Sequence, residues 1–288
     1  MKTVGEARIW LKEKLKNLFS AEELPQLRFL IMHTITGLSQ TQIHAFPEKE
    51  LSDQQTAMLL LSVKKLETGM PVQYALGEAD FFELKFKVDP SVLIPRPETE
   101  ELVAWVLEQK RIWERVKDAK ILDIGTGSGC IPVALKKNWP EAAVFGLDVS
   151  TEALHIAQKN ALQNQVEIGF FKQDILNFYP IKEASAYSII VSNPPYIVPS
   201  EQKLMQANVL DFEPHLALFV PEADPLLFYR AISDYAFSSL AAKGLLFFEI
   251  NPKFHSAVLQ LLQEKGFVEI TVKQDFGGKI RMVRALKP

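Results

Sequence analysis

A glycine-rich turn is the first group of residues whose types and spacing indicate chemistry. The apolar segment Ile121–Ile124 leads into a run of small residues, namely Gly125, Thr126, Gly127, Ser128 and Gly129. Glycines permit a tight turn and a close approach of the backbone to a ligand. About 20 residues further on, a second apolar segment ends at Asp148, where a carboxylate can accept hydrogen bonds from a ribose diol. This order of elements predicts a site for an adenosine-bearing ligand.

Two features of the turn discriminate between adenosine-bearing ligands. The glycines follow G-x-G-x-G, whereas the dinucleotide pattern is G-x-G-x-x-G, and its last position here is Cys130. Asp123, just before the turn, would repel a phosphate and favour a cation. Both features predict S-adenosylmethionine, which carries positive sulfonium and amino groups and leaves as S-adenosylhomocysteine. A later strand ends at Asp174 and Ile175, an acid for the adenine amino group and an apolar side chain for its ring.

A second group of candidate residues follows the apolar segment Ile189–Val191, and it consists of Asn193, Pro194, Pro195 and Tyr196. Two consecutive prolines remove backbone donors and hold the chain extended and rigid. The side-chain oxygen of Asn193 and the carbonyl of Pro194 can both accept from one planar NH2 group, which aims its nitrogen at a methyl donor. Tyr196 offers a flat face to an amide or a base. The loop predicts methyl transfer to nitrogen, catalysed mainly by positioning and desolvation.

The elements that must position these residues alternate along the chain from Glu98 onward. Expected strands are Lys120–Ile124, Ala143–Leu147, Val166–Phe171, Tyr187–Val191, Gly244–Glu249, Val268–Lys273 and Ile280–Ala285. Expected helices are Glu100–Trp113, Ser128–Asn138, Thr151–Leu162, Leu226–Leu240 and Phe254–Lys265. This alternation predicts an α/β fold with a doubly wound, Rossmann-like sheet covered by helices on both faces, and an antiparallel hairpin at its end.

The residues before Glu98 have a different pattern. Residues 1 to 70 are expected to be helical, with an apolar face on the first helix made by Leu11, Leu15, Leu18 and Phe19. Residues 82–88 alternate apolar and charged side chains, which predicts one half-buried strand followed by a turn at Asp89 and Pro90. We therefore expect a helical recognition domain (1–76), a β-hairpin linker (77–97) and a methyltransferase domain (98–288).

Composition restricts the class of protein and its partners. The 288 residues are 48% hydrophobic and 23% charged, which is typical of a globular protein and excludes wholesale disorder. With 32 basic and 35 acidic residues, stable nucleic-acid binding is not expected. The single cysteine, the lack of an apolar leader and the short apolar runs favour a cytoplasmic protein without a membrane partner. We expect a monomer, and the scattered histidines predict no metal site.

The chain resembles the HemK/PrmC protein-glutamine methyltransferases over nearly its whole length. The matching segments are Pro71–Gly77, Leu93–Glu100, the glycine turn, Asp148, Asn193–Tyr196 and Phe212–Pro214. The resemblance implies a class I S-adenosylmethionine-dependent methyltransferase acting on the Gly-Gly-Gln glutamine of class I peptide release factors. It also implies that Gly125 to Gly129, Asp148, Ile175 and Asn193 contact the cofactor. Asn193, Pro194 and Tyr196 would hold the glutamine amide.

Alternatives remain at this point. We group Pro195 and Glu213 with the substrate-contacting residues, although Glu213 and Pro214 can equally form a simple turn. A glutamine of a ribosomal protein, or an exocyclic amine of a flipped nucleic-acid base, would fit the same loop. A nicotinamide oxidoreductase is disfavoured by the glycine spacing. A non-catalytic cofactor-binding module is disfavoured by the intact Asn193 and Tyr196.

Overall fold

The computed structural model describes residues 1–113, 119–177 and 187–288, which divide into two compact units. The first unit consists of residues 1–77 together with 207–212. The second consists of residues 78–206 and 213–288. Each unit has its own hydrophobic core.

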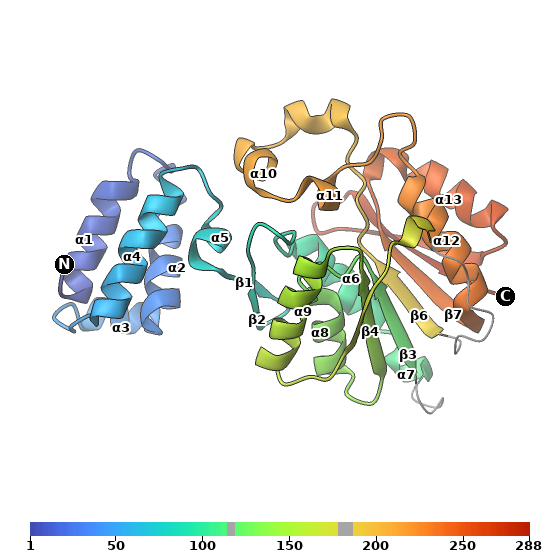
Figure 1. The fold of residues 1–288 in the computed structure, drawn as a ribbon, viewed down its shortest axis with the longest axis horizontal. Helices are drawn as coiled ribbons and strands as arrows, with labels where there is room; N and C mark the ends of the chain where they lie inside the picture. Colours follow the sequence, from blue (N-terminus) through green and yellow to red (C-terminus); the bar gives the residue numbers. More distant parts are fainter. Residues whose placement is uncertain (114–118, 178–186) are drawn as a thin grey trace. The chain divides into compact units, whose positions relative to one another are not determined.

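The first unit is helical (Figure 1). Its helices are α1 (Val4–Leu15), α2 (Leu24–Thr36), α3 (Gln40–Ala45), α4 (Asp53–Leu66), α5 (Val72–Leu76) and α10 (Ala207–Phe212). Capping boxes fix where two of them begin, because Ser39 pairs with Gln42 and Ser52 pairs with Gln55. Apolar side chains of α1, α2 and α4 form the core. The predicted helical character of residues 1 to 70 is confirmed, and α5 and α10 lie outside that predicted range.

The second unit contains a seven-stranded sheet in the order β5-β4-β3-β6-β7-β9-β8 (Figure 1). Its strands are β3 (Lys120–Ile124), β4 (Ala143–Asp148), β5 (Gly169–Lys172), β6 (Tyr187–Ser192), β7 (Leu240–Glu249), β8 (Val268–Gln274) and β9 (Ile280–Leu286). The first five are parallel, and β9 runs antiparallel to both β7 and β8. The predicted α/β class with its antiparallel end is confirmed.

Helices cover both faces of this sheet. One face carries α6 (Pro97–Leu107), α8 (Cys130–Asn138) and α9 (Thr151–Gln163), and the other carries α12 (Leu227–Ser239) and α13 (His255–Glu264). Neighbouring strand residues point to opposite faces, so Ile121 and Phe247 enter one core while Leu122 and Phe248 enter the other. Burial on both sides explains why the central strands are almost continuously apolar.

The hairpin before the sheet differs from the prediction. The expected single strand over residues 82–88 is wrong, because the chain turns at Phe82 and Glu83 between β1 (Glu78–Phe81) and β2 (Leu84–Lys87). Both turn residues have positive φ, 50° and 61°, as in the turns that favour glycine or asparagine. With neither residue type present, the sequence carried no sign of this turn. Helix α6 also begins earlier than expected, at Pro97. A proline is tolerated there because the backbone N–H that it lacks would have no partner in the first turn of a helix.

Shorter elements complete the second unit. They are α7 (Lys110–Trp113), α11 (His215–Leu218) and the 3₁₀ turns η1 (Ile175–Asn177), η2 (Pro199–Leu204) and η3 (Pro252–Phe254). Across the described ranges, no helix has the length and apolar character needed to cross a bilayer.

Candidate active site

A cavity of about 340 Å³ opens at the carboxyl ends of the parallel strands of the second unit. Strands β3 and β6 are neighbours here, and the strand order reverses between them, which is where open α/β sheets bind ligands. Most of the predicted site residues line this cavity: Gly125, Gly127, Asp148, Asp174, Ile175, Asn193, Pro194 and Pro195. The topology thus brings together two loops that are about 65 residues apart in the chain.

The glycine turn is held in shape by backbone bonds and by tight packing. The amides of Gly125 and Thr126 both donate to the Leu147 carbonyl, at 2.8 and 3.0 Å. Gly125 and Gly127 have φ of +76° and +51°, and a Cβ on either would meet no atom within 4 Å. At Gly129, by contrast, a Cβ would lie 3.0 Å from the Cβ of Ala157 on α9. The first two glycines therefore leave open space for a ligand, and the third lets α8 and α9 approach.

Asp148 links the turn to the end of β4. Its two carboxylate oxygens accept from the amides of Gly127 and Ser150, at 2.8 and 2.9 Å. Burial raises the pKa of Asp148, and these amide bonds act in the opposite direction. Each carboxylate oxygen has a second lone pair, so the residue can still accept from hydroxyls in the cavity.

Asp174 and Ile175 lie on the cavity wall after β5. The Asp174 carboxylate accepts from the Leu176 amide at 2.9 Å and from the Asn177 side chain at 2.6 Å. These bonds hold η1 in place and keep Ile175 on the wall, where it also packs against the core on the α12 face. The Asp174 carboxylate is therefore already engaged in local bonds.

Asp123 lies in the interior beneath the turn. It is fully buried, and within the described residues neither carboxylate oxygen meets the geometry of a hydrogen bond; the buried Thr126 hydroxyl likewise lacks a partner there. Burial raises the pKa of Asp123 to about 7, with the nearby Thr126 side chain acting to lower it and Asp148 to raise it. A buried acid without partners is costly unless a donor or a cation approaches it. The donors and charge of S-adenosylmethionine fit this requirement.

Cys130, Ser128 and Thr126 face the protein interior. Each is at least nine-tenths buried, and none of the three side chains lines the cavity. Burial raises the pKa of the Cys130 thiol to about 12, which keeps it protonated. A packing role for Cys130 follows.

The Asn193 side chain has a defined orientation. Its Nδ2 donates to the Thr99 hydroxyl at 3.1 Å, so the amide oxygen Oδ1 takes no part in that bond. Just before it, the Ser192 hydroxyl donates to the Ile124 carbonyl at 2.6 Å, which ties the end of β6 to the end of β3. Asn193 therefore stands beside the glycine turn with its acceptor atom not committed to Thr99.

Tyr196 and Glu213 do not line the cavity. The Tyr196 hydroxyl donates to Glu249 Oε1 at 3.0 Å, and burial, followed by the Glu249 charge, raises the tyrosine pKa. Glu213 is 3% exposed, pairs with Arg96 and accepts from the Ile94 amide at 3.3 Å. Glu213 thus binds the linker segment through Arg96 and Ile94. The following residues Pro214, Leu216 and Ala217 line the cavity.

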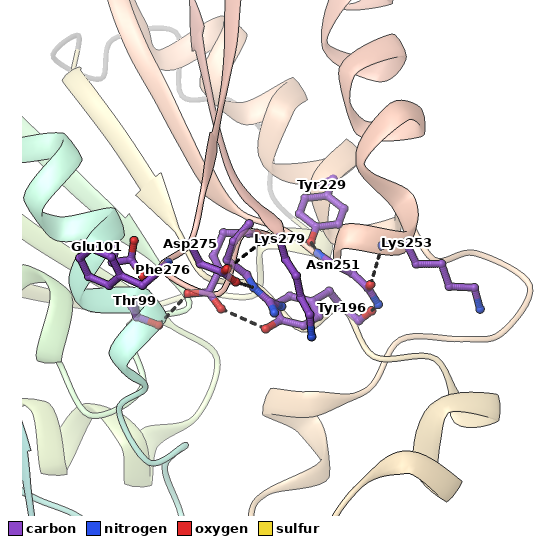
Figure 2. A network of polar contacts seen from close by, with 11 residues as sticks. Thr99, Glu101, Tyr196, Tyr229, Asn251, Lys253, Asp275, Phe276 and Lys279 are labelled. Carbon is purple, nitrogen blue, oxygen red and sulfur yellow. Dashed lines mark hydrogen bonds and ion pairs between the residues drawn. The ribbon is translucent and has the colours of Figure 1, made fainter.

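Sequence reasoning missed a buried network that joins α6, β7 and the loop after β6 (Figure 2). The Thr99 hydroxyl donates to Glu249 Oε2 at 2.6 Å, and Tyr196 binds the other oxygen. Asn251 continues the network by donating to the Tyr196 carbonyl at 3.2 Å. A signal for Glu249 was present, since it is an acid that ends a long apolar strand, as Asp148 does. Residues 91–93 of the linker also line the cavity without any such signal.

The fold and this site define a class I methyltransferase. The family model "Methyltransferase small domain" matches residues 101–213. Among solved structures, the chain resembles the hMettl16 catalytic domain in complex with the MAT2A 3′UTR hairpin 6, at 15% identity, TM-score 0.54 and 82% coverage of both chains. It also resembles the T. thermophilus 16S rRNA N2 G1207 methyltransferase RsmC, at 20% identity, TM-score 0.50 and coverage of 73% of this chain and 50% of that one. At these identities the likeness concerns the fold alone.

Whole-length relatives identify the family. The model "PrmC N-terminal domain" matches residues 6–77. A release factor glutamine methyltransferase of Flavobacterium psychrophilum is 42% identical, covering 94% of this chain and 95% of the relative. One of Bacteroides thetaiotaomicron is 38% identical, with coverage of 96% and 97%. The chain belongs to the release factor glutamine methyltransferase family.

Proposed function

We propose that this protein transfers a methyl group from S-adenosylmethionine to the side-chain amide nitrogen of the glutamine in the Gly-Gly-Gln motif of class I peptide release factors. The whole-length similarity to enzymes of that name supports the substrate class. The single structural observation that carries the chemistry is the orientation of Asn193, which donates to Thr99 and so keeps its oxygen as an acceptor beside the cavity.

The cofactor would be held by the residues around the glycine turn. Asp148 would accept from the ribose hydroxyls, Ile175 would pack on the adenine ring, and Asp123 would balance the positive methionine portion. Gly125 and Gly127 provide the open space that a close ligand needs. When bound, S-adenosylmethionine supplies an electrophilic methyl group on a sulfonium. The described carboxylates around the cavity suit that positive charge.

The substrate amide would be held by the loop after β6. Asn193 Oδ1 and the Pro194 carbonyl would accept from the two N–H bonds of the glutamine amide. An amide nitrogen is a weak nucleophile, and two acceptors raise its electron density while fixing its direction. Pro194 and Pro195 line the cavity and keep this geometry rigid. We assign Tyr196 a supporting place, because its hydroxyl is engaged by Glu249.

We further propose that the helical residues 1–76 recognise the release factor. Their similarity to the PrmC N-terminal domain supports this assignment. Amide hydrogen exchange of the intact protein tests it. Slower exchange in helices α1 to α4 on addition of unmethylated release factor is expected, and unchanged exchange there would refute the assignment.

The decisive experiment is methyl transfer from labelled S-adenosylmethionine to an unmethylated release factor. A copy in which the motif glutamine is changed to alanine is the matched control. Label on the first protein and none on the second is expected. Label on both would assign a different acceptor residue, and label on neither would reject the release factor as substrate and direct the assay to ribosomal proteins and nucleic acid.

A further inference from the structure

Glu249 is a buried carboxylate whose two oxygens serve two different functional side chains. It ends β7 and is 1% exposed. Oε2 accepts from the Thr99 hydroxyl at 2.6 Å, and Oε1 accepts from the Tyr196 hydroxyl at 3.0 Å. Thr99 lies on α6, 150 positions earlier in the chain. One carboxylate therefore joins α6 to the loop that carries Asn193 and Tyr196.

The chemistry of a carboxylate fixes the direction of each bond in this chain. An ionised carboxylate only accepts, so Thr99 must use its one proton on Glu249. The Thr99 oxygen can then only accept on its other side, and Asn193 must present its NH2 there, as the 3.1 Å bond shows. A reversed Asn193 amide would set its oxygen against the lone pairs of Thr99. The free face of the asparagine is therefore an acceptor.

We propose that Glu249 is a positioning residue that sets the orientation of the Asn193 amide through Thr99 and holds the Tyr196 ring directly. This inference rests on the proposed function. An acceptor at Asn193 is useful only if the substrate group is an NH2 donor such as a primary amide. It makes the loop selective for an NH2 donor before any substrate arrives. A group without an N–H or O–H in the same place, such as a carbonyl oxygen, would face the Asn193 oxygen without being able to donate to it.

The contacts of Glu249 are those that an ionised carboxylate makes, because both of its oxygens accept from hydroxyl groups. Burial is the largest influence and raises the pKa of Glu249, and the charge of Glu98 acts in the same direction. The bonds from Thr99 and Tyr196 and the positive charge of Arg281 act to lower it. Arg281 is itself held by Asp275, whose carboxylate it contacts at 3.2 Å. Hydrogen bonds to the charged form and a nearby cation oppose the cost of burying a carboxylate.

The test is Thr99→Val, which keeps the shape of the side chain and removes the hydroxyl. We expect kcat for methyl transfer to the release factor to fall by about 10- to 100-fold, with the KM for release factor and the affinity for S-adenosylmethionine changed less than about threefold. Thr99→Ser, which restores a hydroxyl, should recover most of kcat. The matched control is Thr271→Val on the exposed surface of β8. Wild-type kcat in Thr99→Val would overturn the proposal.

A spectroscopic readout separates this proposal from the proposed function. The Asn193 side-chain amide signal, assigned by its loss in Asn193→Ala, should shift and exchange faster with solvent in Thr99→Val without any substrate present. An unchanged signal would overturn the orientation argument. If wild-type protein methylates no release factor while the amide signal responds as expected, the proposed substrate fails and the orientation of Asn193 stands.

Glu249→Gln provides a second and independent test. Glutamine keeps the size but must present its NH2 either to Thr99 or to Tyr196. The first choice forces Thr99 to turn its proton toward Asn193 and reverses the asparagine amide. The second makes the Tyr196 hydroxyl the acceptor, so its proton must turn away from residue 249 and the tyrosine loses its present orientation. We expect a loss of kcat of the same order as in Thr99→Val, with S-adenosylmethionine still bound. Full activity of this variant would contradict the proposal.

Discussion

The backbone amide of Gly127 donates to Oδ2 of Asp148 at 2.8 Å, which links the turn after β3 to the acid at the end of β4. The two residues are 21 positions apart, and both line the cavity. Asp148 holds the glycine turn in shape, and the proposed ribose contact would be a second role for the same carboxylate.

Asp148→Ala should weaken S-adenosylmethionine binding by about 1–3 kcal/mol, because a hydrogen-bonding charged group is lost and the turn loses its anchor. Asp148→Asn keeps one oxygen acceptor and should fall between the alanine variant and the wild type. Isothermal titration calorimetry measures both affinities. Equal affinity of the alanine variant and the wild-type protein would refute the ribose assignment.

Gly129→Ala should lower the free energy of unfolding by more than the backbone cost of a positive φ. The added Cβ would lie 3.0 Å from Ala157 on α9, and Gly129 has φ of +77°. The left-handed conformation costs about 1–2 kcal/mol, and overpacking adds about 1–3 kcal/mol.

The matched control for this change is Gly278→Ala in the β8–β9 hairpin. Its φ is +79° and a Cβ there would meet nothing within 4 Å, so the control carries the backbone cost alone. Urea unfolding of the intact protein compares the two. Equal free energies of unfolding for the two variants would mean that α8 and α9 adjust to the extra methyl group without cost.

The elements that carry the site were predictable because their signals are local. Ile121 and Leu122 belong to a largely apolar strand whose two faces must both be covered. The glycines that follow it predict the turn. The carboxyl ends of parallel strands meet at one edge of a sheet, so the position of Asp148 beside that turn followed from the order of the elements.

The contacts that orient the site were not predictable, because they join distant segments. Thr99 and Glu249 are 150 positions apart, and Arg96 and Glu213 are 117 apart. Nothing in the pattern of either segment specifies its partner. Glu213 was grouped with the substrate-contacting residues, yet the structure engages its carboxylate with Arg96 and Ile94; a substrate contact of this residue stays a prediction.

Stability should fall between about pH 4 and pH 7 because of Asp123. Its pKa is raised from an ordinary 3.8 to about 7 in the folded protein, so the folded state binds the extra proton in this range. This contribution to the free energy of unfolding is fully present below about pH 4 and is lost as the pH rises through about 7. Its full size is about 4 kcal/mol.

Asp123→Asn cannot ionise, so its stability should lack this component and exceed that of the wild type at pH 8. Urea unfolding at pH 5 and pH 8 measures the difference for both proteins. Saturating S-adenosylmethionine should reduce the loss in the wild type, because a cation beside Asp123 favours the ionised form. A wild type and variant with the same pH dependence would show that Asp123 does not titrate in this range.

Asn193→Ala should abolish methyl transfer while leaving the cofactor site intact. The change removes the acceptor that would direct the glutamine nitrogen, and a misdirected nucleophile loses about 100-fold or more in rate. The turn residues that would hold S-adenosylmethionine are bonded to Leu147 and Asp148 and not to Asn193, so cofactor affinity should stay within about threefold. Single-turnover transfer of labelled methyl to the release factor gives the rate, and calorimetry gives the affinity. Rapid transfer by the variant would refute the acceptor role of Asn193, whereas a joint loss of transfer and of cofactor binding would move its role from the substrate to the cofactor.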